Sequence, residues 1–222
     1  MSKRKTAIIL CGGLGSRLGA LSKKIPKSMV KINNYPILWF IIKNLIRNSF
    51  NHLILPIGYK GNLIKNYVRK NFKNKNIDIE IIDTGKNTKI AKRIFLVKNR
   101  IKSENFLLIN GDAIFDFNLK KIYEDHEKNL YSMTFIGCEN RLAYGTIGII
   151  GKKIVNFERN ITFNSVKTKN NSRFTAYVYS GMSIINKKVL KINFRDFTNF
   201  EKQLYPKVIK KHKCNFKDFK GF

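Results

Sequence analysis

Short apolar runs alternate with amphipathic segments along the first two thirds of the chain. Apolar runs bounded by glycine, proline or polar residues indicate buried strands, and apolar positions three and four apart indicate helices. The runs predict strands at 6–10, 52–59, 77–85, 105–115 and 131–138. The helical spacing predicts helices at 36–50, 61–72, 89–101 and 119–129. Strands that alternate with helices in this way are typical of a parallel sheet covered by helices.

The pattern changes after residue 138. Segments 145–159 and 174–186 read as β-strands around a polar turn, and segment 199–212 has helical spacing that Pro206 is expected to kink or break. We therefore predict one α/β domain over 1–222, with a Rossmann-like, doubly wound, mostly parallel sheet and a β-rich insertion. Its expected parts are a nucleotide-binding core at 6–138, a β-rich acceptor-binding part at 139–198, and a C-terminal helix and tail at 199–222.

The charge of the chain suggests a polyanionic partner. The chain has 44 Lys and Arg against 14 Asp and Glu, a formal net charge of +30, and such an excess is typical of nucleic-acid-binding proteins. The lysines are scattered, however, and lysine is abundant together with asparagine and isoleucine, a combination that AT-rich genomes favour. The one dense basic cluster, at 207–217, carries apolar residues that can face a core. Nucleic-acid binding therefore stays a rival interpretation, and we expect no nucleic-acid partner.

The cysteines and the longest apolar runs indicate the cellular compartment in which the protein is expected. Cys11, Cys138 and Cys214 form an odd set without short spacing, which argues against a disulfide framework or a zinc site. No apolar run approaches the roughly 18 residues that a membrane helix needs. We therefore expect a cytoplasmic protein without a membrane partner.

A glycine-rich segment follows the first predicted strand and reads "CGGLGSRL". A loop between a first strand and a helix is where α/β proteins bind phosphate groups. The spacing excludes a P-loop, and Leu18 stands where a dinucleotide fingerprint requires glycine. Gly12, Gly13 and Gly15 would let the backbone approach a phosphate chain without a Cβ in the way. Cys11 is interpreted as a packing residue.

An aspartate follows the apolar stretch "LLIN". Asp112 is placed just past the carboxyl end of that strand, the edge at which open α/β sheets hold ligands. Phosphate anions would repel a carboxylate there unless a cation joined them, and Mg²⁺ prefers oxygen ligands. Asp112 is therefore the predicted metal ligand, with Mg²⁺ as the cofactor.

The segment "GGLGSRL" followed by "IPKSM" resembles the signature of the sugar-nucleotidyltransferase family. The segments "PILWFIIKN", "GYKGNLIKNY", "DTGKNT" and "NGD" then follow in the order of its glucose-1-phosphate cytidylyltransferase branch. The resemblance covers nearly the whole chain and implies the nucleotide-diphospho-sugar transferase fold. It also implies that a phosphomonoester, such as a sugar 1-phosphate, attacks the α-phosphorus of a nucleoside triphosphate, here expected to be CTP, and releases pyrophosphate. Products of such enzymes feed capsules and other surface polysaccharides.

The resemblance also implies roles for individual residues. Arg17 would hold the β- and γ-phosphates, Lys27 would neutralise charge near the α-phosphate, and Asp112 would complete the catalytic set. The nucleotide-binding residues would be Leu10, Gly12, Gly13, Gly15, Ser16, Arg17, Lys27, Thr84, Gly85 and Gly111. The acceptor-binding residues would be Tyr144, Gly145, Glu158, Arg159, Ser180 and Gly181.

The chain departs from the branch around the acceptor. Where the branch has T-G-G-R, E-K-P and N-G-G, the chain has Ile90-Ala91-Lys92-Arg93, Glu158-Arg159-Asn160 and Ser180-Gly181-Met182. We therefore expect an atypical acceptor: a modified sugar phosphate, or a non-sugar phosphate such as an amino-alcohol or amino-acid phosphate.

The branch also has a W-x-x-M-D-T segment, with a second metal ligand, after the point that corresponds to Gly221-Phe222. Without this segment, the metal would be coordinated by Asp112 together with phosphates and water, or additionally by Asp83, Asp116 or Asp218. A second rival interpretation is a nucleotide-binding protein without catalysis. The oligomeric state is left open, although relatives often form homo-oligomers.

Overall fold

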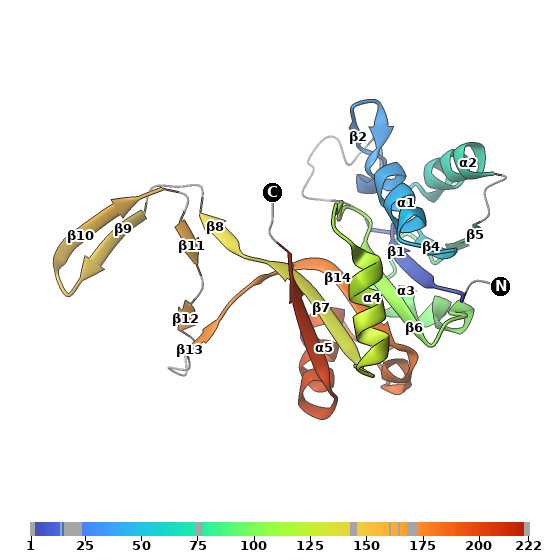
Figure 1. Cartoon of the computed structure of the whole chain (residues 1–222). Coiled ribbons are helices and arrows are strands. Elements are labelled where there is room, and N and C mark those ends of the chain that lie inside the picture. The colour runs from blue at the N-terminus through green and yellow to red at the C-terminus, as the bar shows by residue number, and fades with distance from the viewer. Residues whose placement is uncertain are drawn as a thin grey trace. The chain divides into compact units, whose positions relative to one another are not determined.

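A seven-stranded sheet, in the order β15-β7-β14-β6-β1-β4-β5, is the centre of the fold (Figure 1). Its strands are β1 (Thr6–Leu10), β4 (His52–Ile57), β5 (Asp78–Asp83), β6 (Asn105–Asn110), β7 (Met133–Cys138), β14 (Val178–Asn186) and β15 (Cys214–Asp218). Strand β1 pairs in parallel with β4 and β6, β4 pairs in parallel with β5, and β14 runs antiparallel to β6. The mostly parallel α/β sheet predicted from the sequence is confirmed.

The computed structural model describes residues 3–13, 15, 24–73, 77–142, 146–159, 161–163, 165–167 and 173–219. They belong to two compact units, which we describe separately. The first comprises Met1–Phe135 and Gly181–Asn215, and the second comprises Ile136–Ser180 and Phe216–Phe222.

Continuous apolar runs explain why the central strands are strands. In β1 and β4 nearly every side chain is buried, and Ala7, Ile8 and Leu53 have no exposed surface. Strands that are covered on both faces read as unbroken runs rather than as alternating patterns. The carboxyl ends of β1, β4 and β6 therefore meet at one edge of a buried sheet.

In the part of the chain that the structure describes, five α-helices occupy the segments in which the helical spacing predicted them. They are α1 (Ile37–Arg47), α2 (Gly61–Phe72), α3 (Ile90–Val97), α4 (Leu119–Lys128) and α5 (Phe200–Lys211). Asn118 and Asn199 cap α4 and α5 by accepting hydrogen bonds from the backbone N–H of Lys121 and Lys202. Such caps satisfy donors that the first helical turn leaves free.

The helices lie in two layers around the sheet (Figure 1). Asn48, at the end of α1, accepts a hydrogen bond from the backbone N–H of Lys120 in α4. On the other face, aromatic rings connect α3 to α5. Phe194 lies 5.9 Å from Phe95 of α3 and 5.7 Å from Phe200 of α5, measured between ring centroids.

Two sequence predictions near the C-terminus need correction. Helix α5 continues through Pro206, so the break expected there does not occur, whereas a kink at Pro206 stays a prediction. The segment after it contains strand β15 at an edge of the sheet, where a tail was expected. Its five residues are too few for a periodic signal, and pairing with the sheet decides their conformation.

Short elements occupy the rest of the chain. The first unit also contains strands β2 (Lys31–Ile32) and β3 (Tyr35–Pro36), and 3-10 helices η2 (Lys27–Met29), η3 (Lys98–Arg100) and η4 (Lys187–Lys191). The second unit contains β8 (Asn140–Leu142), β9 (Thr146–Ile150), β10 (Lys153–Glu158), β11 (Ile161–Phe163), β12 (Ser165–Lys167) and β13 (Arg173–Thr175). These pair as β9–β10, β8–β11 and β12–β13, so the predicted β-rich region does form strands.

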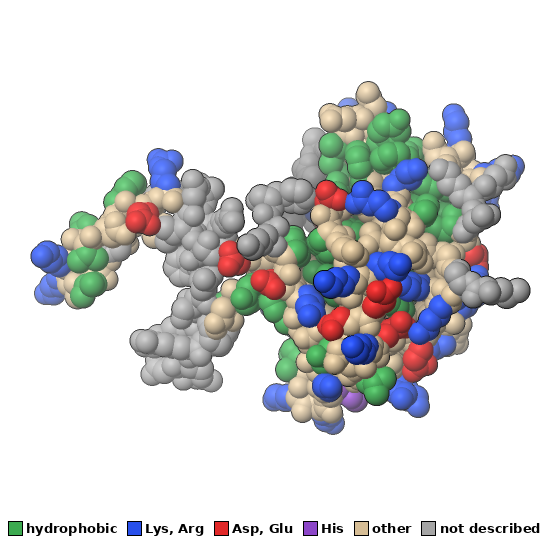
Figure 2. All heavy atoms as spheres, viewed as in Figure 1, with side chains coloured by type: hydrophobic (Ala, Val, Ile, Leu, Met, Phe, Trp, Pro, Cys, Tyr) green, Lys and Arg blue, Asp and Glu red, His purple; other side chains and the backbone are tan. Residues whose placement is uncertain are grey.

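The surface of the first unit shows whether its basic side chains form a patch that could bind a polyanion. On the face seen in Figure 2, lysine and arginine side chains are dispersed among acidic and neutral ones rather than gathered in one patch. Over the described ranges, no helix has the length and apolarity that crossing a membrane requires.

Candidate active site

The loop after β1 and the turn after β6 lie side by side. The two strands pair in parallel up to Leu10 and Asn110, and the backbone N–H of Gly111 donates to the carbonyl of Leu10 at 3.2 Å. A Cβ on Gly111 would lie 2.6 Å from that carbonyl oxygen, so glycine is required for the close approach. The glycine-rich loop and Asp112 are thereby held at the same edge of the sheet.

The three glycines of the loop have different surroundings. A Cβ added at Gly13 would meet no atom of the described residues within 4 Å. Gly15 has φ +64°, in the left-handed region that glycine enters readily. At Gly12, in contrast, the guanidinium of Arg93 occupies the place of a Cβ. Gly13 and Gly15 keep their predicted part in phosphate binding, whereas Gly12 is explained by a protein contact.

Lys27 and Asp112 form an ion pair although 85 positions separate them in the sequence. Lys27 begins the 3-10 helix η2 directly after Pro26, and Asp112 is the second residue beyond β6. The two side chains are 43% and 32% exposed. A cation and a carboxylate therefore lie together, within reach of solvent, at the edge where the open face of Gly13 also lies.

Cys11 and Thr84 are buried and make their contacts within the protein. Cys11 is buried, and burial raises the pKa of its thiol to about 12, which supports the predicted packing role. The Thr84 hydroxyl donates to the carbonyl of Ile57 at 2.7 Å and accepts a hydrogen bond from Arg93. Gly85 follows with φ +89°, and its N–H donates to Asp83. The backbone N–H of Thr84 also donates to the carbonyl of Ile57, at 3.0 Å, and its carbonyl accepts from the Thr88 hydroxyl, so Thr84 is hydrogen-bonded within the protein and its nucleotide contact stays a prediction.

The sequence placed Arg93 in a segment, Ile90-Ala91-Lys92-Arg93, that departs from the cytidylyltransferase branch, and the structure places its side chain in the interior. Its side chain is 2% exposed, and its guanidinium donates to the carbonyls of Ile57 and Lys86.

The predicted acceptor residues fall into different parts of the chain. Gly181 has φ +77°, and a Cβ there would lie 2.5 Å from the amide nitrogen of Asn110, so Gly181 lies next to the end of β6. Ser180 belongs to the second unit, where its hydroxyl donates to the carbonyl of Ile136. Glu158 and Arg159 belong to the second unit as well and are exposed. Their role in acceptor binding stays a prediction.

Four other predicted site residues, Ser16, Arg17, Tyr144 and Gly145, lie outside the described residues. Gly221 and Phe222 lie outside them too.

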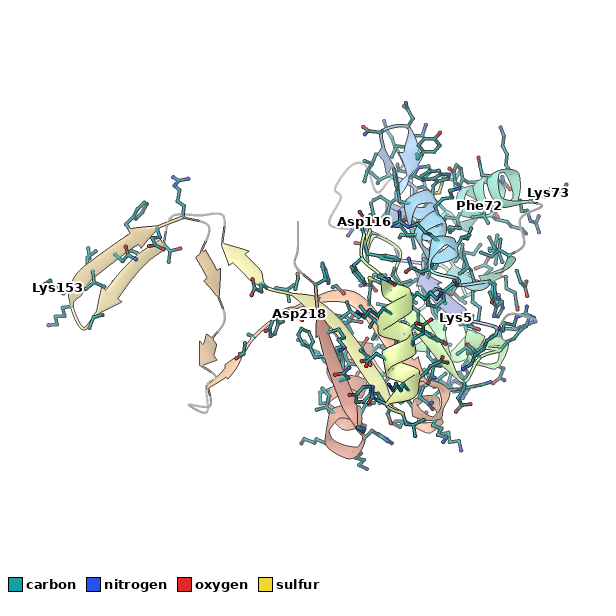
Figure 3. All side chains as sticks on the ribbon, in the orientation of Figure 1. Lys5, Phe72, Lys73, Asp116, Lys153 and Asp218 are labelled. Carbon is teal, nitrogen blue, oxygen red and sulfur yellow. The ribbon has the colours of Figure 1, made fainter. Side chains whose placement is uncertain are left out.

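Two of the three acids proposed as a second metal ligand already have partners within the protein. Asp116, which is labelled in Figure 3, pairs with Arg47 of α1 at 2.6 Å. Asp83 accepts from the N–H of Gly85 at 2.9 Å. Asp218 belongs to the second unit.

A separate cluster of His52, Asp78 and Glu80 has the residue types of a metal site. His52 begins β4 and Asp78 begins β5, so the cluster lies at the amino ends of the strands, the opposite edge from the glycine-rich loop. Lys102 bridges the two carboxylates at 3.0 and 3.2 Å. These acids are therefore neutralised by protein cations, and the cluster does not suit the metal of a phosphate-transfer reaction.

Comparison with known proteins identifies the family. Residues 6–212 match the sequence pattern of the nucleotidyl transferase family. D-glycero-alpha-D-manno-heptose 1-phosphate guanylyltransferase of Campylobacter jejuni is 32% identical over 216 residues, which are 96% of this chain and 91% of that protein. A probable glucose-1-phosphate cytidylyltransferase of Bacillus subtilis is 31% identical over 162 residues, which are 64% of this chain and 64% of that protein.

Among solved structures, HddC from Yersinia pseudotuberculosis complexed with GMP-PN has the same fold. Its TM-score is 0.69 at 24% identity, with 98% of this chain and 92% of that chain covered. The resemblance to sugar nucleotidyltransferases predicted from "GGLGSRL" and "IPKSM" is confirmed. The chain belongs to the nucleotidyl transferase family.

Proposed function

We propose that the protein joins a nucleoside monophosphate unit, taken from a nucleoside triphosphate, to a sugar 1-phosphate. The observation that carries this proposal is the pair of Lys27 and Asp112 beside the open face of Gly13. Two charges of opposite sign at the carboxyl edge of a parallel sheet suit a substrate that brings both phosphates and a metal ion.

The reaction needs positioning and charge stabilisation more than acid–base chemistry. An ionised oxygen of the sugar phosphate forms a bond to the α-phosphorus. The bond from the α-phosphorus to the bridging oxygen breaks, and its electron pair leaves with pyrophosphate. Because the attacking oxygen carries no proton, no general base is required.

Lys27 would stabilise the charge that develops around the α-phosphorus. Its ammonium has three donors, so it can contact a phosphate oxygen while it keeps Asp112 in place. The backbone around Gly13 would bind the phosphate chain, and Arg17 stays the predicted contact of the β- and γ-phosphates.

Asp112 fits a divalent metal ion such as Mg²⁺. Within the described residues, Lys27 contacts one carboxylate oxygen, Oδ2, which leaves Oδ1 for another ligand. Oxygen donors of this kind suit Mg²⁺, which when bound would offset the negative charge of the triphosphate.

The proposal also specifies which nucleotide and which acceptor the protein uses. The sequence resemblance favoured CTP, but the heptose 1-phosphate guanylyltransferase of Campylobacter jejuni aligns with 96% of this chain, against 64% for the Bacillus subtilis relative. We therefore propose GTP as the donor and a heptose 1-phosphate as the acceptor, with CTP and glucose 1-phosphate as the alternative pair. A heptose phosphate also agrees with the atypical acceptor predicted from Glu158-Arg159 and Ser180-Gly181.

A matrix of substrates tests the proposal. GTP, CTP, UTP, dTTP and ATP would each be combined with heptose 1-phosphate, glucose 1-phosphate, mannose 1-phosphate and an amino-alcohol phosphate, with and without Mg²⁺. Pyrophosphate release is the readout. We expect the highest kcat/KM for GTP with heptose 1-phosphate. Highest activity with CTP would select the alternative pair, and no release from any combination would refute the activity.

A further inference from the structure

The guanidinium of Arg93 lies where three strand ends meet. Its Nη1 donates to the carbonyl of Ile57, the last residue of β4, at 3.1 Å, and also to the hydroxyl of Thr84. Its Nη2 donates to the carbonyl of Lys86 at 3.2 Å. Thr84 and Lys86 belong to the loop that follows β5. One side chain of α3 thus links the ends of two neighbouring parallel strands.

The same guanidinium packs directly against the glycine-rich loop. A Cβ on Gly12 would overlap Nη1 of Arg93, and a Cβ on Gly58 would lie 2.6 Å from the same atom. The backbone N–H of Tyr59 also reaches the carbonyl of Gly12, at 3.4 Å. The loops after β1 and β4 are therefore packed on the Arg93 guanidinium, and both have glycine at the contact.

The charge of Arg93 lacks a close counter-ion. Its hydrogen bonds go to two carbonyl oxygens and one hydroxyl, all of them neutral, and in the part of the chain that the structure describes no carboxylate forms an ion pair with it. Burial lowers the pKa of Arg93, and Asp83 opposes that effect from a greater distance. Arginine nevertheless stays protonated in proteins. A buried positive charge of this kind is costly unless an anion binds nearby.

We propose that Arg93 is a positioning residue for the nucleotide, which holds the glycine-rich loop in its binding conformation and attracts the phosphate chain through its buried charge. This inference rests on the proposed function. Arg93 acts through the loop, because its guanidinium packs against Gly12 and its hydrogen bonds go to Ile57, Thr84 and Lys86. The glycine at position 12 is required by Arg93, whereas Gly13 faces the ligand.

The test compares Arg93→Met, Arg93→Lys and the control Arg100→Met. Arg100 is an exposed arginine near the amino ends of the strands, where it contacts Glu80 at 3.6 Å. Steady-state pyrophosphate release would give kcat and KM for the nucleotide. Calorimetry with GTP and with CTP, in buffer without divalent metal, would give affinity independently of turnover.

Arg93→Met is expected to raise the KM and the dissociation constant of the nucleotide by about tenfold or more, as the loss of one nearby charge implies. Its kcat should change much less, since the residue does not contact the reacting atoms. Arg93→Lys should restore part of the affinity at pH 7, because a positive charge returns. Arg100→Met should leave affinity unchanged. Unchanged affinity in folded Arg93→Met, or equal losses in the Met and Lys variants, would overturn the proposal.

A double-mutant cycle covers the case in which Arg93→Met binds nothing because its loop is disordered. Gly12→Ala should destabilise the protein with Arg93 present and should be tolerated much better when it is combined with Arg93→Met, as urea unfolding would measure. Additive effects would show that the two residues do not share this contact and would contradict the inference.

The outcomes also separate this inference from the proposed function. Wild-type protein that binds a nucleotide through Arg93 but releases no pyrophosphate would refute only the activity. Active wild-type protein whose nucleotide affinity is indifferent to Arg93 would refute only the role of Arg93.

Discussion

Replacing Lys27 with alanine removes one cation from the edge of the sheet and leaves the Asp112 carboxylate without its partner. The two side chains are 43% and 32% exposed, and exposed ion pairs contribute about 0–1 kcal/mol to stability. We therefore expect the free energy of unfolding to change by less than about 1 kcal/mol. Turnover should fall about 10²–10³-fold, or about 2.7–4 kcal/mol of transition-state stabilisation, as is typical of one lost preorganised donor.

The difference between these magnitudes separates catalysis from folding. Pyrophosphate release at saturating substrates would give kcat, and urea unfolding of the same preparations would give stability. Lys121→Ala, which removes an exposed lysine from α4, serves as the matched control and should change neither quantity. A Lys27→Ala variant that keeps near wild-type turnover would refute the assignment. So would a loss of activity that is matched by a loss of several kcal/mol in stability.

Other predictions concern buried or strained groups of the first unit. His126 is fully buried, with Nδ1 2.8 Å from the Thr134 hydroxyl and Nε2 3.3 Å from Oδ1 of Asn105, and burial lowers its pKa from 6.5 to about 4. Because the folded protein favours neutral histidine, the stabilisation from His126 is present above pH 6.5 and is lost as the pH falls toward 4. The free energy of unfolding should therefore be about 2 kcal/mol lower at pH 5 than at pH 7 because of this group. A His126→Gln variant with the same pH dependence would contradict this. Cys11, which is 4% exposed and has a pKa of about 12, should resist a thiol reagent at pH 8 until urea is added; labelling of native protein at Cys11, located by mass spectrometry, would count against it. Pro206→Ala should raise the free energy of unfolding by about 1–2 kcal/mol, because proline inside a helix removes a hydrogen bond; a destabilised variant would show that this position gains from proline.

Elements with a strong local pattern could be predicted from the sequence. Helix α2 begins and ends at the predicted residues, Gly61 and Phe72, since its apolar positions recur every three or four residues and a glycine begins it. Strand β1 was equally clear, because its apolar run stops just before a glycine pair, whereas the strand predicted at 105–115 ends at Asn110 as β6. The family followed from "GGLGSRL" and "IPKSM", since the spacing of these groups is specific and lies within one short stretch of chain.

Arg93 shows where this reasoning fails. Helix α3 buries Ala91, Ile94 and Val97, while Ile90 and Leu96 are 45% and 51% exposed. The apolar positions therefore do not define one face, and a charged residue at the margin can lie on either side. Packing against the strand ends placed Arg93 in the interior, because the carbonyl groups there and the absence of a Cβ on Gly12 accommodate its guanidinium.

The sequence by itself determined the alternation of strands and helices and the family, and it predicted the roles of Lys27 and Asp112. Only the tertiary structure decided that these two residues meet, that Arg93 is buried, and that β15 joins the sheet. The physical reason is that the periodicity of a sequence reflects only interactions between residues a few positions apart. The ion pair instead joins positions 85 residues apart, one at the start of η2 and the other just beyond β6.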